Sequence, residues 1–338
     1  MKIILATIWN VANYGALLQC YGLCKYLTDN GHDVSLLDLS MSNTNILLKK
    51  LKSVTINRPF ENFKKKLPKP VKIGEHNADI YITGSDQVWN PDILGDRIYT
   101  YMLDFAPLES RKVSYAASFG NSEWKDSTRY QYAKKLLSSY NRITVREDSG
   151  VNILKDTFGI DGVQVLDPCF LIRDYYELIG RIDNSDTNNL VVFKLVQSST
   201  WKSEISDLSK LMGCNLAELN GKYISRLGLL RGFNQKHPKV SEWLKQIATA
   251  KWVITDSFHC MVFSIIFHKQ FVILPSIRER STRLTSLLNK LGLENRIADS
   301  VDECAEILEN NIDYTIVDQK LNILKHKSIE ELEKLLQI

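Results

Sequence analysis

The chain has 338 residues, which is too long for one ordinary hydrophobic core and indicates two domains. Its apolar content of 44% and charged content of 24% are those of a globular protein in water, and they exclude a fibrous or disordered class. The formal net charge of +4 is too small to indicate nucleic-acid binding, so we expect no nucleic-acid partner.

The first half of the chain alternates short apolar runs with segments of helical period, which is typical of a parallel α/β sheet. The predicted strands cover residues 2–8, 33–37, 79–83, 112–116, 142–145 and 163–166. The predicted helices cover residues 16–30, 129–139 and 148–158. Asp167 and Pro168 end this series, and residues 169–180 are predicted to cross to a second domain.

The second half repeats the alternation. Its predicted strands cover residues 190–195, 215–219, 252–255 and 271–274, and its predicted helices cover 201–211, 240–250 and 258–267. We expect an N-terminal domain at 1–168 and a C-terminal domain at 169–316. A charged amphipathic helix at 317–338 is expected to pack back on the N-terminal domain.

The six cysteines are scattered and form no CxxC pair. Cys20 and Cys24 fall on one face of a predicted helix, where buried thiols are favoured over a metal site. Free thiols indicate a reducing compartment, and the early charge in the N-terminal ten residues argues against a signal peptide. His268, Lys269 and Gln270 interrupt the longest apolar stretch, so we expect a cytoplasmic protein without a membrane span.

The most informative stretch runs from Lys251 to Arg283. One predicted strand ends at Asp256-Ser257-Phe258-His259, and the next opens into a loop that carries the arginines 278, 280 and 283. Ligands of such strand–helix–strand units bind beyond the carboxyl ends of the strands. An imidazole at one strand end and three cations after the next predict a site for a small, multiply charged anion.

The histidine admits a second interpretation, because a lone histidine is often a satisfied polar residue. The place of His259 in the first turn of a helix, close to Asp256 and Ser257, favours a function. A helix N-terminus lowers a histidine pKa, so a neighbouring anion is needed to keep the ring protonated.

Two loops of the first half are also candidate ligand sites. After the first strand, Gly15 allows close approach of a ligand to a helix N-terminus, although an ordinary turn capped by Asn13 is the alternative. After the strand at 79–83, Gly84, Ser85 and Asp86 precede Trp89. A hydroxyl, a carboxylate and an indole face suit a sugar; a satisfied Asp with a packing Trp is the alternative.

Other polar groups have simpler interpretations. Arg146 and Glu147 are expected to form a structural ion pair, with Asp148 and Ser149 capping a helix. Residues 49–72 hold nine lysines and arginines against one acid, Glu61. Such a run is either solvated surface or a segment that rests on anionic lipid. The chain contains no GxxxxGK[ST], GxGxxG, HExxH or GxSxG motif, so ATPase, dinucleotide-dependent, zincin and nucleophile-elbow functions have no support.

The strand-end segments together resemble the polysaccharide pyruvyl transferase family. The matching segments are NYGALLQ (13–19), GSDQVWNP (84–91), SYAASFG (114–120), VREDSGV (145–151), VLDP (165–168) and TDSFHCMVFSIIF (255–267). The chain departs from the pattern at Ser257, where many members carry an arginine two residues before the histidine. We therefore expect the downstream arginines 278, 280 and 283, rather than residue 257, to contact the phosphate.

The resemblance implies an α/β fold of two Rossmann-like domains that face a central cleft, as in GT-B glycosyltransferases. It implies transfer of a pyruvyl group from phosphoenolpyruvate to two hydroxyls of one sugar in a cell-surface polysaccharide precursor, which is lipid-linked or nucleotide-linked. The product is a cyclic ketal, with release of phosphate. A GT-B glycosyltransferase that uses a sugar nucleotide and a non-catalytic glycan-binding protein are the alternatives.

The resemblance also assigns roles to residues. His259 and Asp86 are the expected catalytic residues, and the C-terminal domain is expected to hold phosphoenolpyruvate. The expected donor-binding residues are Arg278, Arg280, Arg283, Ser257 and Asp256; the expected acceptor-binding residues are Asn13, Tyr14, Gly15, Gly84, Ser85 and Trp89. No metal or cofactor is expected, since arginines can neutralise the donor. Peripheral contact with the inner face of the membrane is assigned to the basic segment 49–72.

Overall fold

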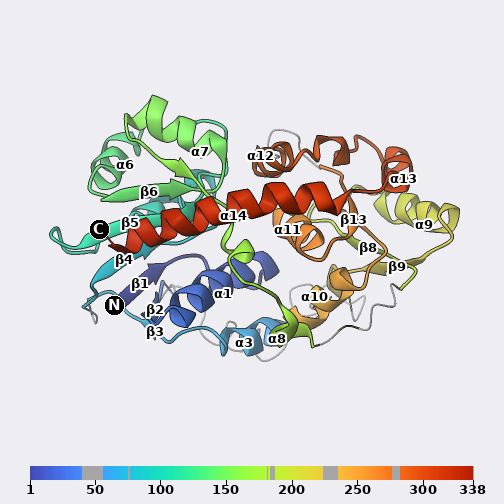
Figure 1. Cartoon of the computed structure of the whole chain (residues 1–338), viewed down its shortest axis with the longest axis horizontal. Helices are drawn as coiled ribbons and strands as arrows, with labels where there is room; N and C mark the ends of the chain where they lie inside the picture. The colour runs from blue at the N-terminus through green and yellow to red at the C-terminus, as the bar shows by residue number, and fades with distance from the viewer. Residues whose placement is uncertain are drawn as a thin grey trace. The chain divides into compact units, whose positions relative to one another are not determined.

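The computed structural model describes residues 1–39, 56–74, 77–180, 182, 187–223, 235–275 and 282–337. The chain forms two compact α/β units (Figure 1). The first unit comprises Met1–Met41, Lys64–Arg173 and Gln319–Ile338, and the second comprises Ser42–Phe63 and Asp174–Asp318. Residues 56–63 fall within the predicted first domain, whereas the structure groups them with the second unit.

The first unit is built on a parallel sheet of seven strands in the order β3-β2-β1-β4-β5-β6-β7. The strands are β1 (Lys2–Ala6), β2 (Asp33–Leu37), β3 (Pro70–Val71), β4 (Ile80–Thr83), β5 (Arg111–Ala117), β6 (Arg142–Val145) and β7 (Val163–Gln164). In the centre of the sheet, Ile3 of β1 lies opposite Val34 of β2 on one side and Ile80 of β4 on the other. All four residues of β4 are buried, as expected of a parallel strand covered on both faces.

The helices of the first unit follow the strands. They are α1 (Tyr14–Asp29), α4 (Pro91–Leu94), α5 (Ile98–Tyr101), α6 (Tyr130–Leu137), α7 (Asp148–Asn152) and most of α14 (Tyr314–Gln337), with short turns at Gly95–Arg97 and Pro168–Phe170. The predicted helix at 148–158 is α-helical only at its start, and a π-helical segment continues it from Ile153 to Phe158. The side chains of Trp89, Phe119 and Phe158 belong to the buried core of this unit.

Helix α14 returns the chain to the first unit, where Figure 1 shows it beside β5. The hydroxyl of Ser328 accepts a hydrogen bond of 2.9 Å from the backbone N–H of Leu166. The carboxylate of Glu331 pairs with Arg142 of β6 at 2.5 Å. Arg111 of β5 donates to the carbonyl of Leu336 at 3.2 Å, near the C-terminal end of the helix.

The second unit contains a parallel sheet in the order β13-β12-β8-β9 and a separate antiparallel pair, β10-β11. The strands are β8 (Asn189–Phe193), β9 (Asn215–Glu218), β10 (Lys222–Tyr223), β11 (Gln235–Lys236), β12 (Trp252–Thr255) and β13 (Gln270–Ile273). The helices are α3 (Arg58–Lys64), which ends at the boundary with the first unit, α8 (Tyr176–Ile179), α9 (Trp201–Leu211), α10 (Val240–Ala248), α11 (Phe258–Ile266), α12 (Thr282–Leu291) and α13 (Val301–Glu309). The large buried side chains of this unit include Trp201, Trp243, Phe263 and Phe271.

Each predicted strand corresponds to an observed one, with ends displaced by at most two residues. The short elements β3, β10 and β11 and the helices α3, α4, α5, α8, α12 and α13 were not predicted. The prediction of buried thiols is confirmed: Cys20 and Cys24 lie on α1 with their sulfurs 3.9 Å apart, and of the six cysteines all except Cys214 are fully buried. Within the described ranges, no helix combines the length and the apolar character that crossing a membrane requires.

Candidate functional site

The first unit has its topological switch point between β1 and β4. From β1 the chain proceeds to β2 and β3 on one side, and from β4 it proceeds to β5, β6 and β7 on the other. In open α/β sheets, ligands bind outside the carboxyl ends of the strands at such a point. Thr7 and Ile8 follow β1, and Gly84, Ser85 and Asp86 follow β4.

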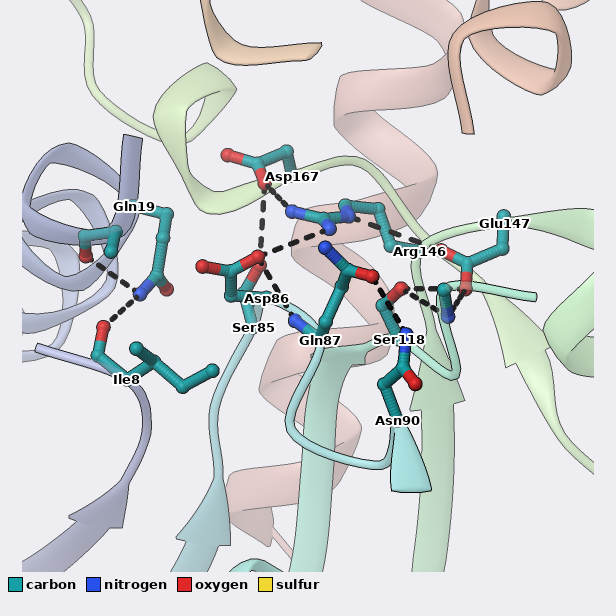
Figure 2. Close-up of polar contacts among 12 residues, drawn as sticks. Ile8, Gln19, Ser85, Asp86, Gln87, Asn90, Ser118, Arg146, Glu147 and Asp167 are labelled. Atoms are coloured by element: carbon teal, nitrogen blue, oxygen red, sulfur yellow. Dashed lines mark hydrogen bonds and ion pairs between the residues drawn. The ribbon is translucent and has the colours of Figure 1, made fainter. Parts of the chain in front are cut away.

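A buried polar network joins these two strand ends. The hydroxyl of Thr7 donates to the carbonyl of Ser85 at 2.8 Å. From α1, the amide of Gln19 donates to the carbonyls of Ile8 at 3.1 Å and Ala16 at 2.8 Å (Figure 2). A Cβ atom on Gly84 would lie 2.7 Å from the Cβ of Thr7, so glycine is required there by the close approach of the two loops.

Beside this network lies a cluster around Arg146, the residue that follows β6. Its guanidinium is 2.8 Å from Asp167, 3.6 Å from Asp86 and 3.9 Å from Glu147 (Figure 2). Burial, the largest effect, lowers the pKa of Arg146, but the three carboxylates together raise it above its ordinary value. The expected pairing of Arg146 with Glu147 is therefore its longest contact, and the shortest joins Arg146 to Asp167.

Glu147 is held by donors from the end of β5. One of its carboxylate oxygens accepts hydrogen bonds from the hydroxyl of Ser118 at 2.7 Å and from the backbone N–H of Phe119 at 3.2 Å. Gly120 has a φ of 73°, and a Cβ atom there would lie 2.1 Å from the side-chain oxygen of Gln87. This turn consequently requires glycine.

Asp86 is the carboxylate of the cluster that reaches solvent. Its side chain is 15% exposed, compared with 0% for Asp167 and 1% for Glu147. Its backbone has a φ of 76°, a strained conformation for an aspartate, and its carbonyl accepts from the N–H of Ser118 at 3.0 Å. The strain is tolerated because the loop is fixed on both sides, and it holds one carboxylate oxygen within 3.6 Å of the Arg146 guanidinium.

The cluster carries more negative than positive charge. One guanidinium against three carboxylates gives 1 − 3 = −2 in formal charge. Such a site attracts hydrogen-bond donors such as sugar hydroxyls and repels anions.

The remaining acceptor candidates lie near this strand end but are used by the fold. Trp89 is fully buried and its indole N–H donates to the carbonyl of Tyr101 at 3.3 Å, which matches the packing alternative. Ser85 is buried and donates to Asp167 at 3.2 Å. Asn13 is exposed and caps α1 by accepting from the N–H of Ala16, as the turn interpretation expected, while Tyr14 and Gly15 are buried in the first turn of α1.

The second unit has its switch point between β8 and β12. The chain leaves β8 towards β9 on one side and leaves β12 towards β13 on the other. Lys194 follows β8 directly and Asp256 follows β12 directly, with the lysine ammonium 3.7 Å from a carboxylate oxygen. The same ammonium donates to the carbonyl of Leu274, which follows β13, at 2.7 Å.

Helix α11 begins at Phe258, two residues after Asp256. Ser257 caps it by accepting from the N–H of Cys260 at 3.4 Å. His259 lies in the first turn, 8% exposed, with its ring edge-on to that of Phe258 at 5.2 Å. The guanidinium carbon of Arg283, from the first turn of α12, lies 6.0 Å from the Phe258 ring and thus near the α11 N-terminus.

The structure therefore brings together part of the predicted anion site. Asp256, Ser257, His259 and the region of Arg283 meet at one end of the second sheet. Arg278 and Arg280 lie outside the described residues. Lys194 was not predicted as a site residue, because the predicted strand at 190–195 included it. Gln19 was not predicted either, and its only sequence signal is an amide within the apolar start of a predicted helix.

Two parallel α/β units of this kind define a protein with the GT-B fold. The solved structures to which the chain is similar share this architecture. They include the spinosyn forosaminyltransferase SpnP (10% identity, all of both chains covered, TM-score 0.53) and UDP-GlcNAc 2-epimerase from Neisseria meningitidis bound to UDP-GlcNAc (11% identity, all of both chains covered, TM-score 0.56). UGT89C1 of Arabidopsis thaliana, complexed with UDP-L-rhamnose, is similar at 8% identity, with 99% of this chain and 98% of that chain covered and a TM-score of 0.59. Identities this low show the fold alone.

Within this fold, the chain belongs to the polysaccharide pyruvyl transferase family, whose model matches residues 13–276. Membership assigns it to the transferases that pyruvylate polysaccharides. No curated protein matches the chain.

Proposed function

We propose that this protein transfers the pyruvyl group of phosphoenolpyruvate to two hydroxyls of one sugar in a cell-surface polysaccharide precursor, forming a cyclic ketal and releasing phosphate. The family match supports pyruvyl transfer. The observation that carries the proposal further is the charge at the switch points of the two sheets. One has surplus carboxylates, which suit an acceptor rich in hydroxyls, and the other gathers cations, which suit an anionic donor.

The reaction needs one proton at the start and must remove two. Protonation of the methylene carbon of the donor leaves positive charge on the carbon that bears the phosphate. A sugar hydroxyl attacks this carbon and loses its proton, and the carbon–oxygen bond to phosphate breaks. The second hydroxyl then adds to the same carbon and loses its proton, which closes the ketal.

His259 is proposed to protonate the departing phosphate or to accept a hydroxyl proton. Its place in the first turn of α11 puts it at the helix end that attracts anions. Asp86 is proposed to accept a proton from the acceptor, because its carboxylate is the solvent-exposed one of its cluster and is fixed by the loop. A positioned acid or base of this kind accelerates a reaction by about 10²–10⁴-fold.

The donor is proposed to bind in the second unit, where arginine can form two parallel hydrogen bonds with a carboxylate or phosphate. Arg283 is the candidate that lies within the described residues. Arg278 and Arg280, which lie outside them, also remain proposed donor-binding residues. Ser257 and Asp256 flank this position, although both side chains already accept backbone hydrogen bonds. We therefore propose that these two residues shape the loop around the donor. The proposed donor site uses neither a metal nor a cofactor.

The acceptor is proposed to bind at the carboxyl ends of β1 and β4. Asn13 and Asp86 are the candidates that reach solvent there, so side-chain contacts are assigned to them, while Tyr14, Gly15, Gly84, Ser85 and Trp89 shape the loops. The acceptor is proposed to be lipid-linked or nucleotide-linked.

A cytoplasmic location, with peripheral contact to anionic lipid through residues 49–72, remains part of the proposal. Residues 49–55 lie outside the described residues. In the remainder, Lys64 donates to the side chain of Asn10 at 2.9 Å, so at least one lysine of the segment has an intramolecular contact.

The test incubates the protein with phosphoenolpyruvate and a panel of lipid-linked and nucleotide sugars. We expect phosphate release and a gain in acceptor mass of one pyruvate ketal. His259→Ala should lower this turnover by about 10²–10⁴-fold. The control is His268→Asn, at the other end of α11, where the left-handed φ of 54° suits asparagine and the ring pairs with Asp318. Wild-type turnover in His259→Ala would remove the histidine from the mechanism.

A glycosyltransferase that uses a sugar nucleotide is the second candidate, favoured by the glycosyltransferases among the similar folds. Thermal stabilisation separates the two. Phosphoenolpyruvate should raise the Tm and UDP or GDP should not. Stabilisation by a nucleoside diphosphate alone, with no phosphate release from phosphoenolpyruvate, would establish the second candidate instead.

A further inference from the structure

Lys194 lies at the switch point of the second sheet, the position at which open α/β sheets bind ligands. It is the first residue after β8, and β8 is one of the two strands that border the switch point of this sheet. Its side chain is 7% exposed and its ammonium lies beside the ends of β12 and β13. A lysine is seldom this deeply buried unless it is paired or binds a ligand.

The carboxylate next to Lys194 is shared with the backbone. The two oxygens of Asp256 accept hydrogen bonds from the N–H groups of Leu195 at 2.6 Å and Val196 at 3.3 Å. The lysine ammonium is 3.7 Å from one of them, which is beyond hydrogen-bond length. Asp256 therefore fixes the loop that follows β8 while neutralising the lysine at longer range.

The surroundings add further positive potential. Helix α9, with eleven residues, begins at Trp201, and the Lys194 ammonium lies 5.4 Å from that ring. Helix α11, with nine residues, begins beside Asp256. Helix N-termini carry partial positive charge, so two of them lie beside the Lys194–Asp256 pair in the described part of this unit. Burial, the largest effect, lowers the pKa of Lys194 below its ordinary value although Asp256 raises it.

We propose that Lys194 binds an anionic oxygen of the donor, phosphoenolpyruvate, and thereby sets the preference of the second unit for a charged donor. The inference rests on the proposed function and adds a donor-binding residue to it. Ser257 cannot supply this charge, because its hydroxyl is neutral, and the hydroxyl already caps α11. Lys194 supplies a cation at the same strand end, one strand away.

The competing interpretation is a structural one. Lys194 links the ends of β8, β12 and β13 through Asp256 and Leu274, and a purely structural lysine would affect stability but not donor affinity. A matched control separates the two. Lys251 lies 4.0 Å above the Trp252 ring at the opposite, amino end of β12, so its replacement removes the same charge and the same kind of ring contact.

The experiment measures phosphate release as a function of phosphoenolpyruvate concentration. Lys194→Met should raise the KM for phosphoenolpyruvate by about 10- to 100-fold, the usual loss for one charge-assisted hydrogen bond, with a smaller change in kcat. Lys251→Met should keep the wild-type KM. If the wild type releases phosphate and Lys194→Met has the same KM, the inference is overturned while the proposed function stands. If the wild type itself releases none, the proposed function fails.

A second variant keeps the test decisive if Lys194→Met does not fold. An arginine stays charged at pH values where a lysine loses its proton. The wild-type KM for phosphoenolpyruvate should therefore rise as the pH approaches 10.5, and Lys194→Arg should lack this rise. Among the described residues, the other titratable groups that influence Lys194 are Asp256 and Cys304, and burial raises the pKa of the Cys304 thiol to about 12. The same rise in both proteins would overturn the inference.

Discussion

The two units place groups of opposite charge at the same position of the fold, the switch point of a parallel sheet. Both have a parallel sheet whose strand order reverses at one point, and both place polar residues directly after the two strands that border it. In the first unit, the nearby cluster is one guanidinium, Arg146, surrounded by three carboxylates. In the second, a lysine ammonium and one carboxylate lie beside the start of α11, with His259 in its first turn and Arg283 close to it.

This contrast shows what the fold decides and what it leaves to the sequence. The sheet order decides where a ligand can bind, and the residues that follow the strands decide which ligand is favoured. The acidic end, which is the carboxylate cluster around Arg146, favours a neutral molecule with many hydroxyls. The cationic end, which holds Lys194 and Arg283, favours a donor that carries a carboxylate and a phosphate. The four changes below test whether this division of charge is functional.

The largest expected effect is on catalysis at the acidic end. Asp86→Asn removes the proposed proton acceptor but keeps its size, so turnover should fall by about 10²–10⁴-fold with little change in stability. The measurement is phosphate release with saturating acceptor. Asp92→Asn, an exposed aspartate of the neighbouring helix α4 that bonds to Asn121, is the control and should retain activity. Equal activity in the two variants would leave the acidic end without a catalytic role.

The next effect is on stability. Arg146→Met leaves three carboxylates, two of them fully buried, without their guanidinium, which should lower the free energy of unfolding by about 3–5 kcal/mol. The penalty should shrink at acidic pH, because protonation of the carboxylates relieves their repulsion. Urea unfolding at two pH values measures both. Arg129→Met, which breaks the surface pair with Asp126, should change stability far less, and a similar loss in both would contradict the proposed cluster.

Removal of a helix cap should lower stability by a smaller amount, and each unit offers one such cap for comparison. Asn13 caps α1 after the first switch strand, and Ser257 caps α11 in the second unit. Replacing either by alanine should lower stability by about 1 kcal/mol, measured by urea unfolding. The KM for phosphoenolpyruvate should remain unchanged in both. A tenfold rise confined to Ser257→Ala would instead assign its hydroxyl to the donor.

The smallest effect is a pH dependence of stability that distinguishes the cationic end. Because the folded protein lowers the pKa of Lys194, the unfolded chain keeps that proton to higher pH. The unfolded state then binds more protons, so this group's contribution to the free energy of unfolding rises with pH in the window that ends near 10.5. The stability of the wild type minus that of Lys194→Met should rise likewise in urea titrations. A constant difference would mean that the lysine is not desolvated.

The sheets were predictable from the sequence because buried parallel strands are short apolar runs between polar turns. Predicted strand ends fell within two residues of the observed ones, and this accuracy already located Asp86, Asp256 and His259 at strand ends. Short elements such as β3 escaped prediction because two residues carry no periodic signal. Helix α12 begins at Thr282, within the stretch of arginines 278, 280 and 283 that was predicted to be a loop, and its start was therefore missed.

The side-chain partners were less predictable, because they come from distant parts of the chain. Sequence proximity suggested that Arg146 pairs with Glu147, but the shortest contact is with Asp167, 21 residues away. Lys194 looked like one more residue of an apolar strand, and only the pairing of β8 with β12 shows that it meets Asp256. Trp89 looked like a sugar platform and is instead packed against Phe119 and Tyr140.

The buried cysteines can report how often each unit opens. Cys20 and Cys24 lie in the first unit, and Cys260 and Cys304, whose pKa values burial raises to about 12, lie in the second. A thiol reagent can modify them only when the surrounding unit opens. Labelling rates followed by mass spectrometry would thus give a separate opening free energy for each half of the molecule, without any introduced probe.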